Sequence, residues 1–397
     1  MKRLFIIGAS ILQLPAIKKA KELGYYTAVA DYNPAAVGIP YADEYYNAST
    51  IDEQAITDAA RRFRPDGIMT LATDMPMRAL ARACAELSLP AISYETAVRA
   101  TDKGEMIKAF EAHNVAHPWF VIVKDASQFE KARAEAAFPC VVKPTDNSGS
   151  RGVAVARSLD ELQSAYEYAR SVSRGGAVII EEYLRGPEFS VEVMVVRGEA
   201  HVLQITDKLT TGEPHFVEMG HSQPGGDSAQ DREAIKDLAV RAVKAVGIHT
   251  GPAHVEMILT EAGPKMVELG ARMGGDCITT HLVPLSTGID MVKATIDCAC
   301  GNEPDITPKF TKGAAIRYFD TARGVISSIS GTEEALAVPG VKEISFVKHA
   351  GERTDGIYSS SDRIGFVVAQ SDTAPDAVRA CERALSLIKI EISGENR

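Results

Sequence analysis

Short apolar runs alternate with amphipathic segments over the N-terminal part of the chain. The apolar runs have strand length and few charges, and they lie at 3–8 (RLFIIG), 26–31 (YTAVAD) and 67–73 (GIMTLAT). The segments between and after them carry apolar residues at helical spacing, over Ile11–Leu23, Asp52–Phe63 and Pro76–Leu87. Because strands alternate with helices, we predict a parallel, doubly wound α/β sheet here, followed by a longer helix at 94–113.

From residue 119 onward, strands follow one another more closely and helices are fewer. Strand-like runs are expected at 119–123, 139–144 (PCVVKP), 153–156 (VAVA), 177–184 (AVIIEEYL) and 188–196 (EFSVEVMVV). A capping box at Ser158–Glu161 predicts a helix start within this region. Further helices are expected at Ala229–Val246, Gly288–Cys300 and Ala374–Ile388, and further strands at 314–319 and 363–369. The pattern predicts an α+β module, then a region of further strands, then a mixed tail after the Pro-rich segment 301–309.

Composition limits the classes of function. The 397 residues are 45% hydrophobic and 24% charged, which is typical of a globular protein with two or three domains. The net charge of −10, with no basic stripe, argues against nucleic-acid binding. No uncharged apolar run reaches the ~18 residues of a membrane span, and Gly8 to Ser10 interrupt the apolar N-terminal run, unlike a signal peptide. The six cysteines include no CxxC pair, so we expect free thiols. From the charge and the apolar runs, we expect a cytoplasmic protein with no nucleic-acid or membrane partner.

The segment 254–269 is typical of a β-hairpin with one glutamate in each strand. HVEMILT is the first strand, EAGP the turn and KMVEL the second strand. If Glu256 lies opposite Glu268, Ile258 and Met266 share their face, since side chains on one face recur every second residue. Two ionised carboxylates this close repel each other, so we expect a cation between them. Mg²⁺ suits such a pair, because it takes one or two carboxylates together with waters and substrate phosphates. The alternative is two glutamates on the solvent face of a hairpin.

Two turns outside the hairpin also carry candidate ligand-binding residues. The loop PTDNSGSRG at 144–152 is small, polar and glycine-bearing, follows Lys143, and can turn its backbone N–H groups toward an anion. The alternative is an ordinary surface hairpin tip. The segment EEYLRGPE has Glu181 and Glu182 at a strand end and Glu188 at the start of the next strand. A carboxylate there can accept both hydroxyls of a ribose, and strand-end backbone can bind an adenine edge; the alternative is a charged surface turn.

Taken together, these motifs resemble the ATP-grasp superfamily over nearly the whole chain. The matching segments are TDK at 101–103, VVKP at 141–144, SGSRG at 148–152, EEYLRGPE at 181–188, and Glu256 with ELGAR at 268–272. The pattern GxRxGGD at 270–276 and the tail make the chain most similar to the carboxylate–amine (L-amino acid) ligases, which also resemble glycinamide ribonucleotide synthetase and biotin carboxylase.

The resemblance implies an ATP-grasp fold of mixed α/β and α+β class. Its expected parts are a pre-ATP-grasp α/β domain with a doubly wound parallel sheet at 1–113, an ATP-grasp domain at 114–305 with a small lobe (114–186) and a large lobe (187–305), and a C-terminal α+β lobe at 306–397.

The resemblance also implies roles for individual residues. The residues that would hold ATP are Lys103, Lys143, Ser148, Gly149, Ser150 and Gly152 for the phosphates, and Glu181, Glu182, Tyr183, Leu184 and Glu188 for adenine and ribose. Glu256 and Glu268 would ligate Mg²⁺, or Mn²⁺ in its place, and Arg272 would act with Lys143 on the transferred phosphate.

One position departs from the family pattern. Many ATP-grasp enzymes have an Asn metal ligand two residues after the second glutamate, and this chain has Gly270 there. A full two-metal site therefore lacks one side-chain oxygen. His221 is a candidate for the acceptor site, with a structural role as the alternative, and the same alternatives apply to Asp74 and Asp276.

The implied reaction joins a carboxylate to an amine. ATP phosphorylates the carboxylate to an acyl phosphate, the amine displaces phosphate, and ADP and phosphate are released. The expected partners are small, amino-acid-like acids and amines, and the resemblance implies a homodimer. The alternatives are a biotin- or purine-type carboxylase that uses bicarbonate, a non-catalytic nucleotide-binding protein, and an NAD oxidoreductase. The last is disfavoured because the turn after the first strand, GASILQ, lacks the GxGxxG pattern, although Asp31 ends the second strand.

Overall fold

The computed structural model describes residues 1–147, 149 and 151–393, and it begins with a parallel sheet. The strands β1 (Arg3–Ile7), β2 (Tyr26–Asp31), β3 (Glu44–Asn47) and β4 (Gly67–Met69) lie in the order β3-β2-β1-β4. The helices are α1 (Leu14–Glu22), α2 (Glu53–Phe63) and α3 (Met77–Leu87). The predicted doubly wound sheet is confirmed. The first helix begins at Leu14 rather than Ile11, because Pro15 is favoured in the first turn of a helix.

The segment 94–113 forms two helices, α4 (Tyr94–Arg99) and α5 (Lys103–Ala112), so the prediction of one continuous helix is wrong. The break falls at Asp102, whose Oδ1 accepts a hydrogen bond from the backbone N–H of Glu105 at 3.0 Å. Such a cap satisfies a donor that a helix start leaves without an internal partner. Lys103 therefore begins α5, and its backbone N–H donates to the carbonyl of Thr145 at 2.8 Å.

A small antiparallel sheet follows. Its strands β5 (Phe120–Val123), β6 (Cys140–Pro144), β7 (Ala154–Ala156) and β8 (Val178–Glu182) lie in the order β5-β8-β6-β7. The helices α6 (Ala126–Glu135) and α7 (Leu159–Val172) pack together, and Phe129 stacks on Tyr166 with ring centroids 4.0 Å apart. Ser158 caps α7 as predicted, since its Oγ accepts from the backbone N–H of Glu161 at 3.2 Å.

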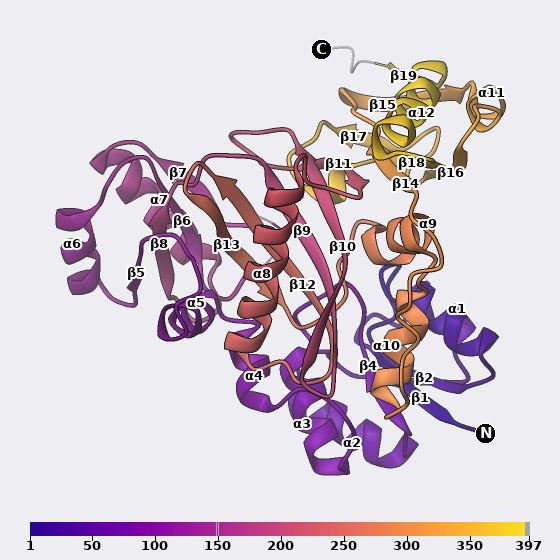
Figure 1. Ribbon diagram of the computed structural model, residues 1–397, viewed down its shortest axis with the longest axis horizontal. Coiled ribbons are helices and arrows are strands. Elements are labelled where there is room, and N and C mark those ends of the chain that lie inside the picture. Colours follow the sequence, from indigo (N-terminus) through magenta and orange to yellow (C-terminus); the bar gives the residue numbers. More distant parts are fainter. Residues whose placement is uncertain (148, 150, 394–397) are drawn as a thin grey trace.

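The central sheet has eight strands, all paired antiparallel, in the order β13-β12-β9-β10-β11-β14-β18-β16. Their bounds are β9 Glu188–Val196, β10 Glu199–Thr210, β11 Glu218–Gln223, β12 Gly251–Thr260, β13 Gly263–Gly270, β14 Gly313–Tyr318, β16 Val341–Phe346 and β18 Gly365–Ser371. The long helix α8 (Ala229–Val246) lies along this sheet in Figure 1. The C-terminal strands β14, β18 and β16 thus continue the same sheet as β12 and β13, and β14 joins it by pairing with β11.

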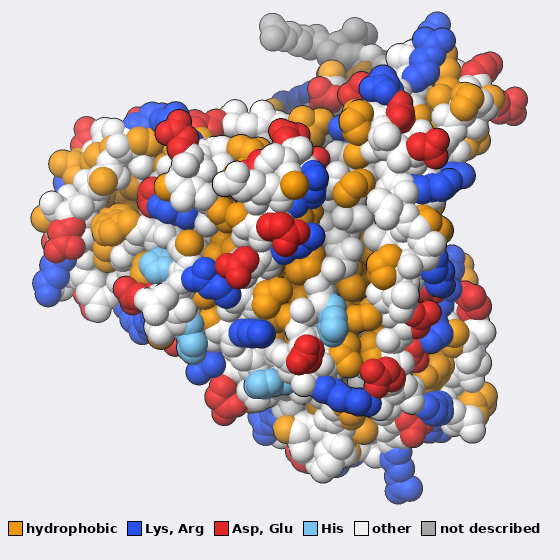
Figure 2. Space-filling view, viewed as in Figure 1, with side chains coloured by type: hydrophobic (Ala, Val, Ile, Leu, Met, Phe, Trp, Pro, Cys, Tyr) orange, Lys and Arg blue, Asp and Glu red, His pale blue; other side chains and the backbone are white. Residues whose placement is uncertain are grey.

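The rest of the chain links and caps these parts. The connecting helices are the π-helical turn Ile278–Leu282, α9 (Val283–Thr287) and α10 (Met291–Ala299). The C-terminal region, orange to yellow in Figure 1, adds α11 (Thr332–Leu336), α12 (Ala374–Leu387) and the sheet β17-β15-β19, whose strands are Arg353–Asp355, Arg323–Ser330 and Lys389–Ser393. No helix in the described ranges combines the length and apolar character needed to cross a bilayer. Figure 2 shows acidic and basic side chains interspersed over the visible face.

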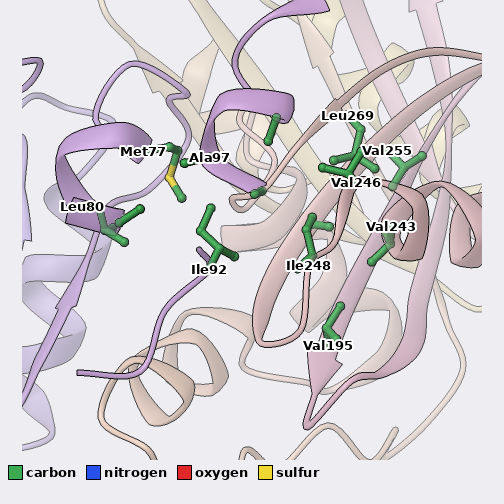
Figure 3. Packing of buried hydrophobic residues seen from close by; sticks show 14 of the residues in the cluster. Met77, Leu80, Ile92, Ala97, Val195, Val243, Val246, Ile248, Val255 and Leu269 are labelled. Atoms are coloured by element: carbon green, nitrogen blue, oxygen red, sulfur yellow. The ribbon is translucent and has the colours of Figure 1, made fainter. Parts of the chain in front are cut away.

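The largest core cluster joins the N-terminal sheet to the central sheet (Figure 3). Met77 of α3 and Ile92 belong to the same buried cluster as Ile248, Val255 and Leu269. Because side chains alternate along a strand, burying Val255 and Leu269 on this face turns their neighbours in β12 and β13 to the opposite face. The fold thereby presents the polar positions of the hairpin away from the core.

Candidate active site

The hairpin formed by β12 and β13 pairs Glu256 directly with Glu268, as the sequence predicts. A β-bulge follows at once, and Met266 pairs with Met257 instead of Ile258. The extra residue of a bulge shifts the alternation of side chains by one position. Met266 is therefore buried in the core, 1% exposed, and the prediction that it shares the face of the glutamates is wrong.

Glu256 lies between two cations. Lys208 Nζ is 3.0 Å from Glu256 Oε2, and His254 Nε2 is 3.0 Å from Glu256 Oε1. Burial favours the neutral carboxyl, but these positive charges outweigh burial and hold the pKa of Glu256 well below its usual range. Lys208, whose side chain is 3% exposed, is also 2.5 Å from Glu188 and 3.6 Å from Glu218. One buried lysine thus compensates three carboxylates.

Glu268 is paired with the lysine that begins α5. Lys103 Nζ lies 2.8 Å from Glu268 Oε1 and donates to the backbone carbonyl of Asn147 at 2.7 Å. Burial lowers the pKa of Lys103, but the charge of Glu268 outweighs burial and raises it. The ammonium group therefore stays charged, and it connects the hairpin to the glycine-bearing loop after β6.

That loop is described in part, because Ser148 and Ser150 lie outside the described residues. Gly149 and Gly152 have φ of 66° and 84°, in the left-handed region that favours glycine. A Cβ on Gly152 would also come within 2.5 Å of Val172 Cγ2. The two glycines let the backbone turn sharply beside α7, which is a requirement of a loop that directs N–H groups at an anion.

The predicted nucleotide residues at the ends of β6 and β8 form a row of ion pairs. Lys143 Nζ lies 2.6 Å from Glu181 Oε2, and both side chains are buried. Glu182 Oε2 is 2.7 Å from Lys265 Nζ of the hairpin, which ties the small sheet to β13. Tyr183 follows directly after β8. The remaining residues of this set are Leu184, in the turn after β8, and Glu188, the first residue of β9.

The segment after β13 is fixed by two forked ion pairs. Arg272 Nε and Nη2 lie 2.9 and 3.0 Å from the carboxylate oxygens of Asp74. Arg363, from the C-terminal region, lies 2.8 and 2.7 Å from the oxygens of Asp276. His221 is 1% exposed, and its Nε2 is 3.5 Å from the Asp276 carboxylate. Burial raises the pKa of Asp276, but Arg363 and His221 outweigh burial and lower it. His221, Asp74 and Asp276, for which the sequence left the role open, therefore all take part in contacts between ionisable side chains.

Known proteins share the fold over nearly the whole chain. One family model, described as an ATP-grasp domain, matches residues 136–280, and another, described as L-amino acid ligase C-terminal domain 2, matches residues 317–393. Residues 136–280 therefore contain an ATP-grasp domain. The structure of an L-amino acid ligase from Bacillus licheniformis matches with a TM-score of 0.86 at 23% identity, covering 99% of each chain. A phosphoribosylglycinamide synthetase from Anaerococcus prevotii has a TM-score of 0.81 at 24% identity, covering 99% of this chain and 100% of its own. An alanine–anticapsin ligase from Bacillus subtilis is 25% identical over 98% of this chain and 85% of its own length.

The glutamate pair of this ATP-grasp protein fits Mg²⁺ as an incomplete set of ligands. Glu256 is ionised, and carboxylate oxygens are the ligands that Mg²⁺ prefers. Among the described residues, no group of three or more His, Cys, Asp or Glu is arranged to hold a metal. An ion at the pair would take the rest of its shell from phosphates and water. In the structure, Lys208 and Lys103 supply the positive charge expected beside the carboxylates, and Mg²⁺ itself stays a prediction.

Four further residues of the candidate site were not predicted from the sequence: Lys208, Glu192, His254 and Arg363. Strand alternation could have found two of them. His254 precedes Glu256 by two positions in β12, and Glu192 lies opposite His254 in β9, with 2.5 Å between Oε1 and Nδ1. Arg363 carries no local signal, because only the packing of the C-terminal region brings it to Asp276.

Proposed function

We propose that this protein is an ATP-dependent ligase that joins a carboxylate to an amine through an acyl phosphate and releases ADP and phosphate. The observation that carries the proposal is the combination of an ATP-grasp domain with a C-terminal domain of the L-amino acid ligase type in one chain. Strand β14 of that C-terminal region pairs with β11, so the region is built directly onto the sheet of the site. The names of the related alanine–anticapsin ligase and L-amino acid ligase support amino-acid-like substrates.

In this proposal, the lysines bind the phosphates of ATP. Lys103 and Lys143 are donors paired with Glu268 and Glu181, at 2.8 and 2.6 Å. Phosphate oxygens can replace those carboxylates as acceptors without moving the lysines far, which reduces the cost of ordering them. The other residues proposed to bind ATP are Ser148, Gly149, Ser150 and Gly152 for the phosphates, and Glu181, Glu182, Tyr183, Leu184 and Glu188 for adenine and ribose.

Glu256 and Glu268 are the proposed ligands of Mg²⁺, with Mn²⁺ as a substitute. Held by these two carboxylates, a divalent ion would supply positive charge that neutralises the phosphates of ATP. Lys208 and His254 keep the Glu256 carboxylate ionised and aligned. Arg272 has its fork occupied by Asp74 and offers its remaining N–H donors to the transferred phosphate.

The chemistry requires positioning and charge neutralisation rather than a side-chain nucleophile. A carboxylate oxygen attacks the γ-phosphorus of ATP, and ADP leaves. The acyl phosphate that forms has phosphate as a good leaving group, so the amine nitrogen attacks the carbonyl carbon. The C–O bond to phosphate then breaks, and the nitrogen loses a proton. A cytoplasmic location and a homodimer remain predictions beside this mechanism.

The test is to incubate the protein with Mg²⁺, ATP and pools of amino acids and small acids, and to measure ADP, AMP, phosphate and new masses. ADP and phosphate should form in equal amounts only when both an acid and an amine are present, with a product mass of acid plus amine minus water. Glu268→Gln should abolish this turnover while circular dichroism shows the fold unchanged. AMP with pyrophosphate would contradict the proposal. ADP formation with bicarbonate alone would indicate the carboxylase alternative, and ATP binding without turnover would indicate the nucleotide-binding alternative.

A further inference from the structure

Steric crowding accounts for the glycine at position 270, where many ATP-grasp enzymes have an Asn metal ligand. Gly270 follows Glu268 by two positions in β13, so a side chain there would point toward the same face. A Cβ on Gly270 would lie 2.6 Å from Asp74 Oδ1 and 3.0 Å from Arg272 Nε. The φ angle of Gly270 is not positive, so its backbone conformation is open to any residue. Any side chain at position 270 would therefore displace the Asp74 carboxylate from its present place.

The carboxylate that fills this space comes from the N-terminal sheet region. Asp74 lies in the loop between β4 and α3, after Ala72, whose φ of 60° is uncommon for a residue other than glycine. The backbone N–H of Met77 donates to the carbonyl of Asp74 at 3.1 Å and closes the turn that begins α3. This turn carries the carboxylate across to the segment that follows β13.

The pair of Asp74 and Arg272 fixes the orientation of the guanidinium. The two bonds measure 2.9 and 3.0 Å, and the side chains are 14% and 13% exposed. A planar fork sets the direction of an arginine as well as its position, unlike a contact to a point charge. The charges of Glu256 and Glu268 also reach this guanidinium, so it lies within electrostatic range of the proposed metal ligands.

We propose that Asp74 is the positioning residue of Arg272, and that Gly270 provides the space for it. The proposal rests on the proposed function, because it assumes that Arg272 acts on the transferred phosphate. Many ATP-grasp enzymes have a metal-ligand side chain at the position of Gly270. In this chain, the Asp74 carboxylate occupies that space and binds Arg272. The orientation of the Arg272 guanidinium then depends on how the loop after β4 packs against the end of β13.

The first test compares kcat and KM. Asp74→Asn keeps the shape of the side chain but places an NH₂ group against an Arg272 donor. It should lower kcat for ADP release by ~10²-fold and leave the KM for ATP within about threefold, because a misaimed group acts on the transition state more than on nucleotide binding. In an Arg272→Ala background, Asp74→Asn should cause no further loss. The matched control is Asp43→Asn, which removes a carboxylate held by Lys21 in the same region and should leave kcat unchanged.

The second test addresses the space. Gly270→Ala should lower kcat and the thermal unfolding midpoint in the wild-type background, because the new methyl group displaces Asp74. In an Asp74→Ala background the tightest contact is gone and Arg272 is released from its fork, so Gly270→Ala should cost less in both measurements than it does in the wild-type background. Additive effects of Gly270→Ala and Asp74→Ala on unfolding would overturn the steric explanation. Additive losses of kcat from Asp74→Asn and Arg272→Ala would overturn the positioning role.

The unfolding measurements use no nucleotide or substrate, so they separate this inference from the proposed function. The wild-type protein could form no ADP in any pool while the effects of positions 74 and 270 on the unfolding midpoint are not additive. That outcome would contradict the proposed function and leave the contact between the two positions established. Turnover by the wild-type protein without coupling would contradict only the inference. If Asp74→Ala fails to fold, Gly270→Ala is compared in the wild-type and Asp74→Asn backgrounds. Asn has the shape of Asp, so the methyl group gains no room and should lower the unfolding midpoint in both backgrounds. The loss of kcat caused by Asp74→Asn then decides whether Asp74 positions Arg272.

Discussion

Replacing Lys208 with methionine would leave three carboxylates in one site without their shared cation. The side chain of Lys208 is 3% exposed, and Glu188, Glu256 and Glu218 lie 2.5, 3.0 and 3.6 Å from its Nζ. Removing one partner of a buried ion pair costs about 3–5 kcal/mol, because the remaining charge stays buried and unpaired. At about 2.1 cal/mol/K per residue, the unfolding entropy of 397 residues is about 0.8 kcal/mol/K. The cost then corresponds to a fall of about 4–6 °C in the midpoint of a cooperative transition.

The assay is thermal unfolding at neutral pH, with and without Mg²⁺. The matched control, Lys236→Met, removes a surface lysine of α8 that is 42% exposed and paired with Glu233. A surface pair contributes about 0–1 kcal/mol, so this midpoint should change by about 1 °C or less. Mg²⁺ should raise the midpoint of Lys208→Met more than that of the wild-type protein, because the uncompensated carboxylates bind a cation more tightly.

Lowering the pH should reduce the difference in unfolding midpoint between the wild-type protein and Lys208→Met. Burial already raises the pKa of Glu188 with the lysine present, and the variant loses the charge that opposes this. A carboxyl with a raised folded pKa contributes stability at low pH that is lost as the pH rises through that pKa. In the wild-type protein, the lowered pKa of Glu256 contributes stability above the ordinary value of 4.5, and acid removes it. An unchanged midpoint at neutral pH, or a gap that widens in acid, would refute the account of Lys208 as the shared cation.

Two further predictions concern the C-terminal region. Arg363→Ala leaves the partly buried Asp276 without its forked partner and should lower the unfolding midpoint by several degrees; the double variant with Asp276→Ala should lose less than the sum of the single losses, and simple additivity would contradict the pairing. A hydrogen bond with Cys277 and the contact with Glu343 at 3.2 Å raise the pKa of His281 to about 10. Its stabilisation relative to His281→Gln should be complete below the ordinary pKa of 6.5 and be lost as the pH rises through about 10, and a pH series of unfolding midpoints that stays parallel would contradict this.

Local patterns in the sequence determined the elements and the face on which the glutamates lie. Alternation in HVEMILT and KMVEL predicted the opposition of Glu256 and Glu268, and the structure pairs them. The parallel N-terminal sheet followed in the same way, from strands alternating with helices, whereas the ATP-grasp fold followed from the resemblance of the combined motifs to that superfamily. These features are readable because strand alternation, helical spacing and capping depend on residues only a few positions apart.

Tertiary structure alone decided the charge partners and the irregularities of the site. Lys208 meets Glu256 because β9 lies between β10 and β12, an order of strands that no local spacing encodes. Asp74 meets Arg272 because the loop after β4 packs against the end of β13, and the bulge that buries Met266 appears only once the hairpin packs on the core. Burial is what makes these contacts selective: a charge removed from water must find a partner wherever the fold provides one, and that partner can come from any distance along the chain.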